Sequence, residues 1–529
     1  MADFNMFVMA ILLATSLAVG AKIITTSLKK RPGPLPPGPK GLPLLGNIMD
    51  LPPKGKREWE HWLKLKDTYG PISSVTVLGK TIVILHSAEL ALELLAKRSL
   101  LYSTRPKRVY GVFAGWHNVM GSLPNNEMYR HERRLSHVTL GTAKNAARYL
   151  PLQYMESHRF LFRVLQKPEL LVDHIRTNAG AVILKIVYGY TVDPHKPDTL
   201  VDIIDAAMQG FADSVIAGSW LVDMIPALQY LPRWMPGSGW KDEARASRAI
   251  AKNVSEKPMR FAQQQIIKGS KTQSMVTDFY RDKGLNLSPE VETGLTWAAW
   301  SMYAGGGDTT VTTTSLFFLA MTLYPKVQRK AQEEIDQVVG NGRLPSFDDR
   351  EALPYVNALA LEATRWHQVA PLGVSHSNAD DDIVNGYCIP KGSTIVTNVW
   401  WYMHDPAVYP NPLVYDPSRY LGPNPNPDPR IHTFGYGRRI CPGRYLADTS
   451  IWLTIARSLA VFNITKGLDE NGREIEPHVK FTSGLVSGVE PFKATIKPRS
   501  PAHEALIRQV EELHPWEAGD ADELDKIVI

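Results

Sequence analysis

The segment from Phe434 to Gly443, Phe-Gly-Tyr-Gly-Arg-Arg-Ile-Cys-Pro-Gly, constrains this chain more than any other stretch. It places Cys441 shortly after two spaced glycines and an arginine. Gly437 permits a turn with positive φ or a close approach of two backbones. Arg439 offers a planar, bidentate cation of the kind that binds carboxylates. This composition predicts a loop that holds a sulfur atom beside an anionic group.

The residue after the cysteine, Pro442, suits the first position of a helix, which predicts that Cys441 stands at or near the N-cap. A helix N-terminus stabilises a thiolate and lowers the pKa of a thiol. Because Pro442 has no N–H, donors to the sulfur must come from Gly443 and the residues after it. A haem fits such a site, with the thiolate on its iron and the arginine on its propionates. A small, buried, apolar cysteine is the alternative.

Composition excludes several other classes of protein. The 529 residues include two cysteines, Cys388 and Cys441, so neither a disulfide framework nor a four-thiolate metal site is possible. Two cysteines in so long a chain also argue against an oxidising lumen for the folded part. The net charge of +6 is mild, and without a basic stripe it predicts no nucleic-acid partner. Length alone suggests about three domains, but no repeat or internal linker divides the body.

The N-terminus predicts a membrane anchor over residues 1–28. Residues 4–21 carry no charged side chain and have about the length that crosses a bilayer. The positive-inside rule then places the body in the cytosol, because basic residues follow the apolar run at Lys22, Lys29, Lys30 and Arg31. A secretory signal peptide is the alternative.

The next segment, residues 29–45, is basic and rich in proline, which predicts a stiff, extended hinge. An SH3-type ligand is the alternative. We expect the catalytic body to span residues 46–500. Residues 501–529 hold eight acidic side chains against one arginine and one lysine, which predicts a solvated acidic extension, helical near 504–513.

The body is expected to be mainly α-helical with small β-sheets. Two strands are predicted between Ser73 and Leu85, with the turn at Gly79-Lys80, and a strand-rich stretch over residues 383–399. Helices dominate residues 88–339, interrupted by loops near 110–126 and 230–239. The second loop suits either a surface that meets membrane or apolar substrate, or an ordinary helix connection.

A glycine-rich helix carries a second cluster of polar groups. Ser288 and Pro289 start it, and it runs into Ala-Gly-Gly-Gly followed by Asp308 and Thr309. Three glycines in a helix cost roughly 2–3 kcal/mol against alanine, which indicates a groove where a flat ligand or dioxygen approaches the backbone. A dinucleotide-binding loop is excluded, because no strand precedes the glycines and no final glycine stands at the required spacing.

Every fixed position of residues 434–443 matches F-x-x-G-x-R-x-C-x-G, the haem-ligand pattern of the cytochrome P450 family, and other landmarks follow in order over nearly the whole chain. The chain resembles this family, and in particular its microsomal fungal members of secondary metabolism. The resemblance implies the cytochrome P450 fold and a haem b cofactor with Cys441 as the axial ligand of the iron. The cofactor-binding residues that it implies are Cys441, Arg439, Arg133, His376, Phe434, Gly437, Gly443 and Tyr129.

Two of these positions depart from the family pattern or have a plain alternative. The family places a tryptophan four residues before the arginine that corresponds to Arg133, whereas this chain has Tyr129, whose phenol donates one hydrogen bond with a different reach. His376 matches a slot that often holds a basic residue on a haem propionate, although a lone histidine is more often a satisfied core or surface residue.

The resemblance also assigns catalytic, structural and substrate-pocket residues. Asp308 and Thr309 are expected to be the acid–alcohol pair that delivers protons during oxygen activation. Glu362, Arg365 and Arg419 are expected to form a buried structural cluster, followed by Tyr420 where phenylalanine is commoner. The expected pocket wall consists of Val369, Ala370, Leu372, Leu485 and Val486.

These features predict a membrane-anchored haem-thiolate monooxygenase of the endoplasmic reticulum, single-pass, with a cytosolic catalytic domain. It would oxidise an apolar small molecule, terpenoid or polyketide-like, with O2 and two electrons from an NADPH–cytochrome P450 reductase, because no flavin or nicotinamide segment remains in the chain. The reductase is expected to dock on the cysteine side, where Arg438 and Arg444 add positive charge. The alternatives are a haem-thiolate isomerase or dehydratase that needs no O2, and a non-catalytic haem-binding protein.

Overall fold

The computed structural model describes residues 32–53, 55–194, 196–216 and 218–529. The membrane helix predicted for residues 1–28 therefore lies outside the described residues. Across the described ranges, none of the helices combines the length and the hydropathy that a bilayer crossing requires.

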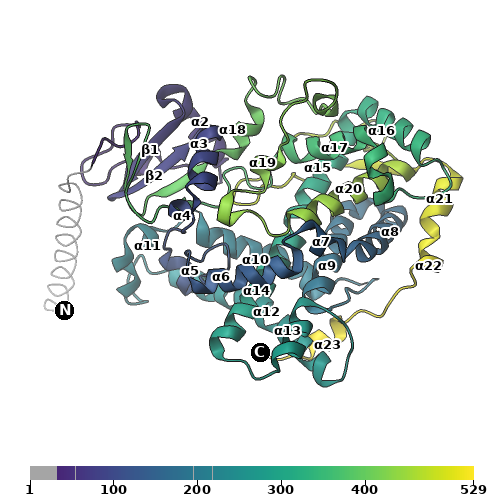
Figure 1. Cartoon of the computed structure of the whole chain (residues 1–529), viewed down its shortest axis with the longest axis horizontal. Helices are drawn as coiled ribbons and strands as arrows, with labels where there is room; N and C mark the ends of the chain where they lie inside the picture. The colour runs from purple at the N-terminus through teal and green to yellow at the C-terminus, as the bar shows by residue number, and fades with distance from the viewer. Residues whose placement is uncertain (1–31, 54, 195, 217) are drawn as a thin grey trace.

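Helices make up most of the body, as the sequence predicted (Figure 1). In the first half they are α2 (Glu58–Tyr69), α3 (Ala88–Leu92), α4 (Ser99–Tyr102), α5 (Val109–Phe113), α6 (Glu127–Leu140), α7 (Ala143–Ala147), α8 (Leu150–Gln166), α9 (Leu171–Tyr188), α10 (Thr199–Val215), α11 (Leu221–Met224) and α12 (Trp240–Ile267). In the second half they are α13 (Met275–Lys283), α14 (Pro289–Gly307), α15 (Thr309–Leu323), α16 (Pro325–Val338), α17 (Pro354–Trp366), α18 (Val399–His404), α19 (Arg430–Thr433), α20 (Arg444–Val461), α21 (Pro501–Arg508), α22 (Val510–Leu513) and α23 (Ala521–Asp525).

Short 3₁₀ or π turns connect these helices: η1 (Ile48–Asp50), η2 (Glu93–Lys97), η3 (Pro168–Leu170), η4 (Pro226–Tyr230), η5 (Phe347–Ala352), η6 (Pro417–Tyr420) and η7 (Gly437–Arg439). The strands form small sheets, also as predicted. They are β1 (Ile72–Val77), β2 (Lys80–Leu85), β3 (His376–Ser377), β4 (Asp382–Val384), β5 (Tyr387–Ile389), β6 (Thr394–Thr397), β7 (Phe462–Lys466) and β8 (Ala494–Pro498).

The largest sheet has four strands in the order β1-β2-β6-β3 and lies at one end of the molecule (Figure 1). The hairpin of β1 and β2 confirms the predicted pair of strands, although the turn falls one residue earlier, at Leu78 and Gly79, which both have positive φ. β2 pairs in parallel with β6, with Val83 opposite Ile395. The β4–β5 and β7–β8 pairs are separate two-stranded sheets.

The proline-rich hinge has no helix or strand over residues 34–41, where it docks on the first sheet, but residues 43–45 form a turn in which Leu44 has positive φ, so the prediction of an extended segment fails there. The Ser74 hydroxyl and amide donate to the carbonyl oxygens of Pro36 and Pro37 at 2.6 and 2.8 Å. A Cβ at Gly38 would stand 1.8 Å from the Ser74 carbonyl oxygen, so only glycine fits this close approach. The hinge is therefore fixed to the body over these residues.

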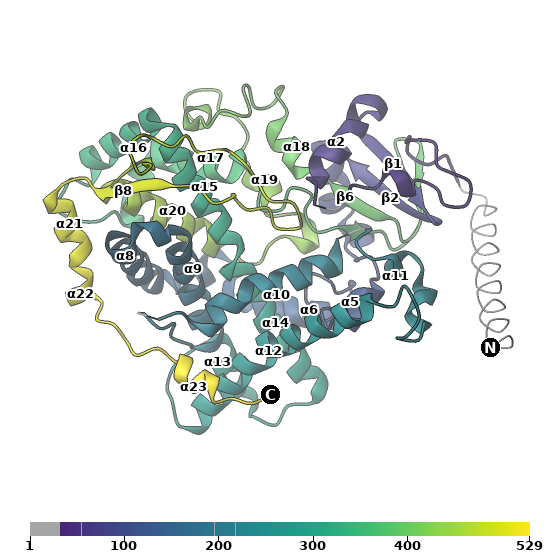
Figure 2. The same cartoon turned by 180° about the vertical axis from the view of Figure 1, so that it is seen from behind.

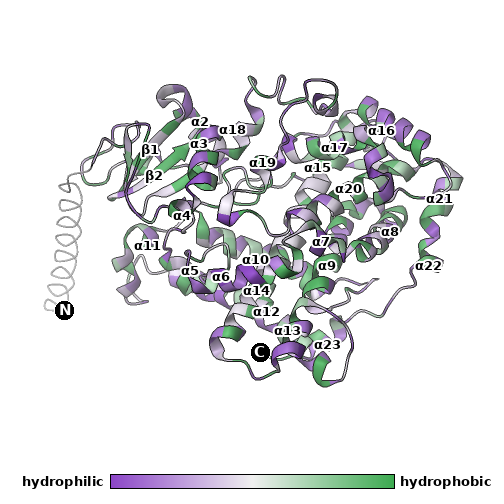
Figure 3. Ribbon diagram, viewed as in Figure 1, coloured by the Kyte–Doolittle hydropathy of each residue, from purple (hydrophilic) through white to green (hydrophobic). Residues whose placement is uncertain are grey.

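The central helices α14 and α15 belong to two different apolar cores. One core gathers residues of α9, α10, α12 and α14, and the other gathers residues of α8, α15, α17 and α20. Outer helices are amphipathic: α16, mixed in colour in Figure 3, buries only Gln328, Ala331, Gln332 and Ile335. Packing in these cores fixes the position of α14, which carries the glycines, and of α15, and so it also fixes Asp308 between them.

The predicted start of the glycine-rich helix is confirmed, but its continuity is not. Ser288 accepts a bond from the Val291 amide at 3.5 Å, and Pro289 stands in the first turn. The helix ends at Gly307 and a new helix begins at Thr309, with Asp308 between them. This junction separates two residues that the sequence treated as one pair.

The predicted cluster of Glu362, Arg365 and Arg419 is present and buried. Arg365 binds both carboxylate oxygens of Glu362 at 2.8 Å, and Arg419 binds one of them at 3.1 Å. The hydroxyl of Tyr420 donates to the second oxygen at 3.2 Å, so the tyrosine found where phenylalanine is commoner adds a donor to this cluster. Arg365 also donates to the Met403 carbonyl, which ties α17 to α18.

The expectation of a solvated C-terminal extension is wrong, although its predicted helicity is confirmed by α21 and α22. Figure 2 shows residues 501–529 in yellow running along the outside of the helical body. Ile507 and Val510 are fully buried in the core around α8, and Leu524 is fully buried in the core around α12. The acidic composition of the segment had suggested a solvated extension. These three apolar residues stand between acidic ones in the sequence, and the fold turns them inward.

Polar contacts fix the same segment. Thr191 and Asp520 exchange two hydrogen bonds at 2.8 and 2.9 Å. The guanidinium of Arg159 lies 4.9 Å from the centre of the Trp516 ring. Glu523 pairs with Lys268 of the body at 2.9 Å. Residues 501–529 therefore form a strap over the helical body, and basic residues of that body neutralise part of its acidic charge.

We expect Leu524→Ala to lower the free energy of unfolding by about 2–5 kcal/mol, because it opens a cavity in a closed core. Leu513→Ala is the matched control, since Leu513 lies in the same strap but is 61% exposed, and its effect should stay within about 0.5 kcal/mol. Urea unfolding of both variants checks this. Equal effects would mean that the strap does not stabilise the body.

We expect Glu362→Gln to cost about 3–5 kcal/mol, because it leaves the buried Arg365 and Arg419 without their carboxylate. Glu504→Gln removes a carboxylate from the exposed Arg508–Glu504 pair and should cost at most about 1 kcal/mol. The measurement is the urea midpoint and the yield of folded protein. A small loss for Glu362→Gln would show that the cluster does not support the fold.

Candidate functional site

The cysteine loop folds as a closed turn, as its glycines predicted. The Cys441 amide donates to the Phe434 carbonyl oxygen at 2.8 Å, which joins the two ends of the loop. Gly437 has φ of +51°, and a Cβ there would stand 2.4 Å from the Leu95 carbonyl oxygen. Both reasons for a glycine at this position, positive φ and close backbone approach, therefore apply.

The helix after the cysteine begins later than predicted. α20 starts at Arg444 with Gly443 as its N-cap, so Pro442 is not the first helical residue and Cys441 precedes the N-cap by two positions. The prediction about the sulfur's donors is confirmed, since the amides of Gly443 and Arg444 both donate to it. A Cβ at Gly443 would stand 3.9 Å from the sulfur, which places the chain of the helix start directly beside it.

The amides of the helix start lower the thiol pKa, as expected, but burial has the larger effect. Burial raises the pKa of Cys441 above its ordinary value. The Gly443 amide and the positive charges of Arg133 and Arg444 oppose this effect without overcoming it. Desolvation of a thiolate deep in the protein outweighs the helix N-terminus, and a positive ion on the sulfur would supply the missing compensation.

Arginines surround the cysteine loop. Arg439 donates to the carbonyl oxygens of Ser103, Met120 and Leu123 at 2.7, 3.1 and 2.7 Å. These three bonds use three of the five N–H groups of a guanidinium and leave two. Arg133 lies near Cys441 and Arg444. The structure thus brings Arg133 and Arg439, the two predicted arginines, to the cysteine loop. Most of the N–H groups of Arg439 bind main-chain carbonyls.

The hydroxyl of Tyr129, which was expected to donate to the cofactor, donates to the main chain of the cysteine loop. The hydroxyl donates to the Arg438 carbonyl oxygen at 2.6 Å, which uses the one proton that a phenol has. Its ring lies 3.6 Å from the guanidinium of Arg439, in a cation–π contact. Tyr129 therefore supports Arg439 and the cysteine loop.

His376 is a buried histidine whose charge and tautomer follow from its surroundings. Burial and the nearby charge of Arg105 lower its pKa well below the ordinary value. Its Nδ1 lies 2.8 Å from the Tyr102 carbonyl oxygen, which can only accept, so Nδ1 carries the proton and Nε2 does not. A neutral histidine of this tautomer cannot donate to a carboxylate from Nε2.

Arg105 is the basic residue that sequence reasoning missed. It donates to the carbonyl oxygens of Val374 and Ser375 at 2.6 and 2.8 Å, and its Nε is buried without a partner. Arg439 is among the charges that lie near it. Nothing in the spacing of the sequence marks Arg105, because its neighbours come from segments more than 260 residues away.

The residues around Cys441 fit a haem. Within the described part of the chain, Glu132 is the one carboxyl among the groups that influence Arg105, Arg133 and Arg439, and it bonds to none of them. Among the described residues these three arginines therefore have no carboxylate partner, and the Nε of Arg105 is buried without a bond. Such a group matches a flat dianion, and a thiol with two amide donors matches a ligand of iron.

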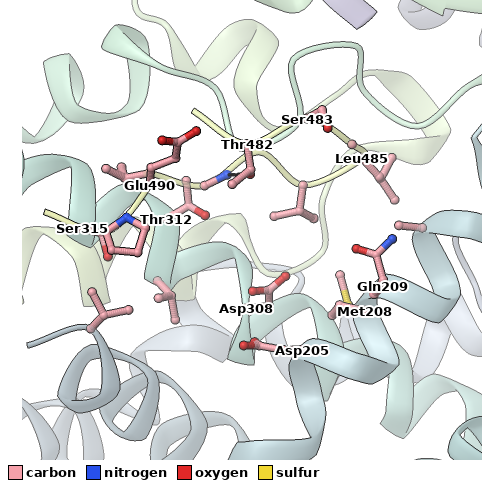
Figure 4. A pocket seen from close by; sticks show the side chains of 18 of the residues that line it. Asp205, Met208, Gln209, Asp308, Thr312, Ser315, Thr482, Ser483, Leu485 and Glu490 are labelled. Carbon is pink, nitrogen blue, oxygen red and sulfur yellow. Dashed lines mark hydrogen bonds between the residues drawn. The ribbon is translucent and has the colours of Figure 1, made fainter. Parts of the chain in front are cut away.

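Asp308, the first residue of the predicted acid–alcohol pair, lies on a cleft of about 1320 Å³, shown in Figure 4. Its walls come from residues 51–53, Gly55, Glu58, η3, α10 and the segment 482–495, and Asp308 lies on its floor. Burial and the negative charge of Asp205 raise the pKa of Asp308 to about 6, against the opposing charge of Arg176. The carboxyl therefore exchanges its proton near neutral pH.

Thr309 lies on the other side of the junction. Its hydroxyl donates to the Gly305 carbonyl oxygen at 2.5 Å, and it is not one of the described residues that line the cleft. A Cβ at Gly305 would meet nothing within 4 Å, which agrees with the predicted open groove, whereas a Cβ at Gly306 would stand 2.7 Å from Ile183. Gly305 leaves space for a ligand, and Gly306 permits helix packing.

The predicted pocket wall is partly assembled in the cleft. Leu485 and Val486 line it. The Ser487 amide donates to the Val369 carbonyl oxygen at 2.8 Å, which places Val369 beside this turn. Ala370 and Leu372 are half-buried and are not among the described residues that line the cleft.

We expect Glu132→Gln to stabilise the protein increasingly with pH. Both oxygens of Glu132 are buried without a hydrogen bond, and burial raises its pKa to about 9 from an ordinary 4.5. Between pH 4.5 and about 9 the folded state therefore binds one proton more than the unfolded state. In this range the free energy of unfolding of the wild type falls by about 1.4 kcal/mol per pH unit relative to that of the variant.

Urea unfolding at pH 5.5, 7 and 8 measures this difference. Glu127→Gln, at an exposed position of the same helix, is the control and should show no such trend. Parallel pH profiles for wild type and Glu132→Gln would contradict the prediction.

Comparison with known proteins assigns nearly the whole chain to one family. The family profile of cytochrome P450 matches residues 36–494. The chain is similar to the cytochrome P450 monooxygenase CLM2 of Gibberella zeae, with 46% identity over 98% of this chain and 99% of that protein. It is also similar to the cytochrome P450 monooxygenase claR of Ampulloclitocybe clavipes, with 44% identity over 93% and 91%.

A third relative has a name that states its substrate. The O-methylsterigmatocystin oxidoreductase of Aspergillus flavus is 36% identical over 94% of this chain and 93% of that protein. The cysteine loop, the paired helices α14 and α15 and the Glu362 cluster thus occur in a chain whose similarity to these proteins is nearly end to end. The chain belongs to the cytochrome P450 family and is one of its monooxygenases.

Proposed function

We propose that this monooxygenase is membrane-anchored and hydroxylates or otherwise oxidises an apolar small molecule of fungal secondary metabolism, with O2 and two electrons from an NADPH–cytochrome P450 reductase. The observation that carries the proposal is the buried Cys441 sulfur, which receives the amides of Gly443 and Arg444 and lies near Arg133. This donor set suits a thiolate ligand of haem b better than it suits a free thiol.

Cys441 is proposed to ligate the iron, and Arg105, Arg133 and Arg439 to hold the propionates. Bound haem supplies the activation of dioxygen and the oxidation of an unreactive C–H bond. The amides on the sulfur limit how much negative charge it carries. Because Arg439 is held by three carbonyls and by the Tyr129 ring, it is positioned before any anion binds.

Asp308 and Thr309 are proposed to deliver protons. The carboxyl of Asp308 has a pKa of about 6, raised mainly by burial, so protonated and ionised forms are both present near neutral pH. The hydroxyl of Thr309 is fixed by its bond to Gly305, and its oxygen keeps lone pairs that accept a proton. A carboxyl on one side of the junction and a hydroxyl on the other can pass protons across it, with water between them.

The substrate is proposed to be apolar and of medium size, terpenoid or polyketide-like. Apolar side chains at the mouth and wall of the cleft support this, among them Leu51, Met208, Ile216, Leu485 and Val486. The relatives are fungal monooxygenases, and one of them is named for the oxidation of O-methylsterigmatocystin. A cleft of about 1320 Å³ exceeds the usual size of a small-molecule pocket, so it accommodates such a compound with water.

The electron donor is proposed to dock on the side of the cysteine loop. Arg438 is exposed there, and Arg130 and Arg134 are exposed on α6, whose Tyr129 contacts that loop. A cluster of this sign steers an acidic flavoprotein surface toward the cysteine.

Anchoring in the endoplasmic reticulum, with a cytosolic body, is proposed from the apolar run before residue 22. Leu42, Leu44, Leu45 and Met49, all exposed and near the described start of the chain, supply further apolar surface for lipid.

We expect Cys441→Ala to abolish both the red-shifted Soret band of the reduced, carbon-monoxide-bound protein and the NADPH-dependent oxidation of substrate. Cys388→Ala is the control, because Cys388 is the chain's other cysteine and lies buried in a strand remote in sequence; it should keep both signals. A thiolate band that persists without Cys441 would exclude it as the ligand. Turnover of substrate without NADPH or O2 would favour an isomerase or dehydratase.

A further inference from the structure

A small cavity lies under the C-terminal strap. It has a volume of about 20 Å³, and its walls come from α8, from α9 and the loop after it, and from residues 516 and 517 of the strap. Figure 2 shows that part of the strap in yellow, in the non-helical stretch that joins α22 to α23. A space of this size holds one particle about as large as a water molecule. The charged side chains that line it are Glu156, Arg159, Arg163, Lys185 and Glu517.

Two arginines of α8 are almost completely buried at this cavity. Arg159 is 4% exposed and Arg163 is 9% exposed. Both bind the buried carboxylate of Glu156, Arg159 at 2.8 Å and Arg163 at 3.3 Å, and among the described residues it is the one carboxylate that either of them binds. Two buried positive charges therefore share one negative charge. Burial lowers the pKa of Arg163 against the opposing effect of Glu156, as expected of a cation with too little negative charge beside it.

Several N–H groups of these arginines lack an acceptor. Within the described ranges, the Nε atom of Arg159 and both the Nε and Nη1 atoms of Arg163 are buried without a hydrogen-bond partner. Three of the five N–H groups of a guanidinium stand on Nε and Nη1 together. Because buried polar groups are almost always paired, these atoms indicate a ligand that accepts hydrogen bonds.

The strap covers both guanidiniums. The centre of the Trp516 ring lies 4.9 Å from the guanidinium carbon of Arg159 and 5.6 Å from that of Arg163. Arg159 also donates to the Pro515 carbonyl oxygen at 2.8 Å. At the outer edge of the cavity, Lys185 of α9 pairs with Glu517 of the strap at 3.2 Å. A ligand bound to the arginines would therefore lie between α8 and the strap.

We propose that this cavity binds a single halide ion, chloride under physiological conditions, and that the ion fixes the strap to α8. The charges that line the cavity are three positive and two negative, which leaves one positive charge to be balanced. Asp520 lies near Lys185, but it accepts the Thr191 amide and is not among the described residues that line the cavity. The proposal is independent of the haem chemistry proposed above.

A halide fits this site better than the other small ligands do. It carries one negative charge, donates no hydrogen bond, and accepts from several N–H groups at once. A water molecule would accept from two of these groups but would leave the excess charge in place. Sulfate and phosphate, each with five heavy atoms, are too large for a space that holds one particle of the size of water.

The first experiment measures thermal unfolding of the ferric holoprotein while chloride replaces gluconate at constant ionic strength. A ligand that binds the folded state alone stabilises it, so about 150 mM chloride should raise the unfolding temperature by about 1–3 °C. Bromide should act like chloride. Sulfate stabilises proteins by exclusion from their surface, so it should act equally on the wild type and on Arg163→Met.

Two variants should change the chloride response in opposite directions. Arg163→Met leaves one arginine against one carboxylate, so the response should be lost. Glu156→Gln removes a negative charge beside the ion, so the chloride concentration that gives half of the response should fall about tenfold. Arg508→Leu is the control, because Arg508 is an exposed arginine of the same strap, and it should respond like the wild type.

Two local measurements need only the wild type. Hydrogen exchange of the amides of residues 514–520 should slow when chloride is added, since the ion lies beneath them. Crystals grown or soaked in bromide should show an anomalous scattering peak in the cavity, within hydrogen-bond reach of Arg163. These measurements keep the proposal testable even where Arg163→Met fails to fold.

Equal chloride responses in the wild type and Arg163→Met would overturn the proposal. A weaker response in Glu156→Gln than in the wild type would do the same, as would density in the cavity with no anomalous signal from bromide, which identifies water. A bromide peak in crystals without any chloride response in solution would mean an adventitious ion only, and would also overturn the proposal.

Discussion

The site depends first on the way Arg439 holds the cysteine loop. One guanidinium binds three carbonyl oxygens, of Ser103, Met120 and Leu123, and stacks on the ring of Tyr129. These contacts join the loop to a segment more than 300 residues earlier in the chain. Rigid, charge-assisted bonds of this kind fix the position of the sulfur and its neighbouring cations before a cofactor binds, and they restrict how far the loop can move.

Local chemistry could be predicted from the sequence, whereas long-range electrostatics could not. The positive φ of Gly437, the amide donors after Pro442 and the Glu362–Arg365 pair all follow from residues within a few positions of each other. Arg105 and Asp205 escaped notice because the fold brings them to the site from distant segments. The size of the burial effect on the Cys441 thiol could not be predicted either, because it depends on what surrounds the sulfur on every side.

The break between α14 and α15 gives neighbouring residues separate surroundings. Asp308 faces a wide cleft that water can enter, whereas the Thr309 hydroxyl of α15 donates back to the Gly305 carbonyl oxygen of α14. An unbroken helix would place consecutive side chains about 100° apart with no change in the axis. The sequence marks this place by its glycines, but the separation itself depends on packing against α9, where Gly306 meets Ile183.

The four-stranded sheet joins parts of the chain that are synthesised far apart. Val83 of β2 pairs with Ile395 of β6, so the sheet cannot be completed until more than 300 intervening residues have been made. Closing so long a loop costs entropy before any of the strand's hydrogen bonds repay it, which slows folding. A proteolytic fragment that ends before β6 would also leave the open edge of β2 exposed, a surface on which other chains can add strands and aggregate.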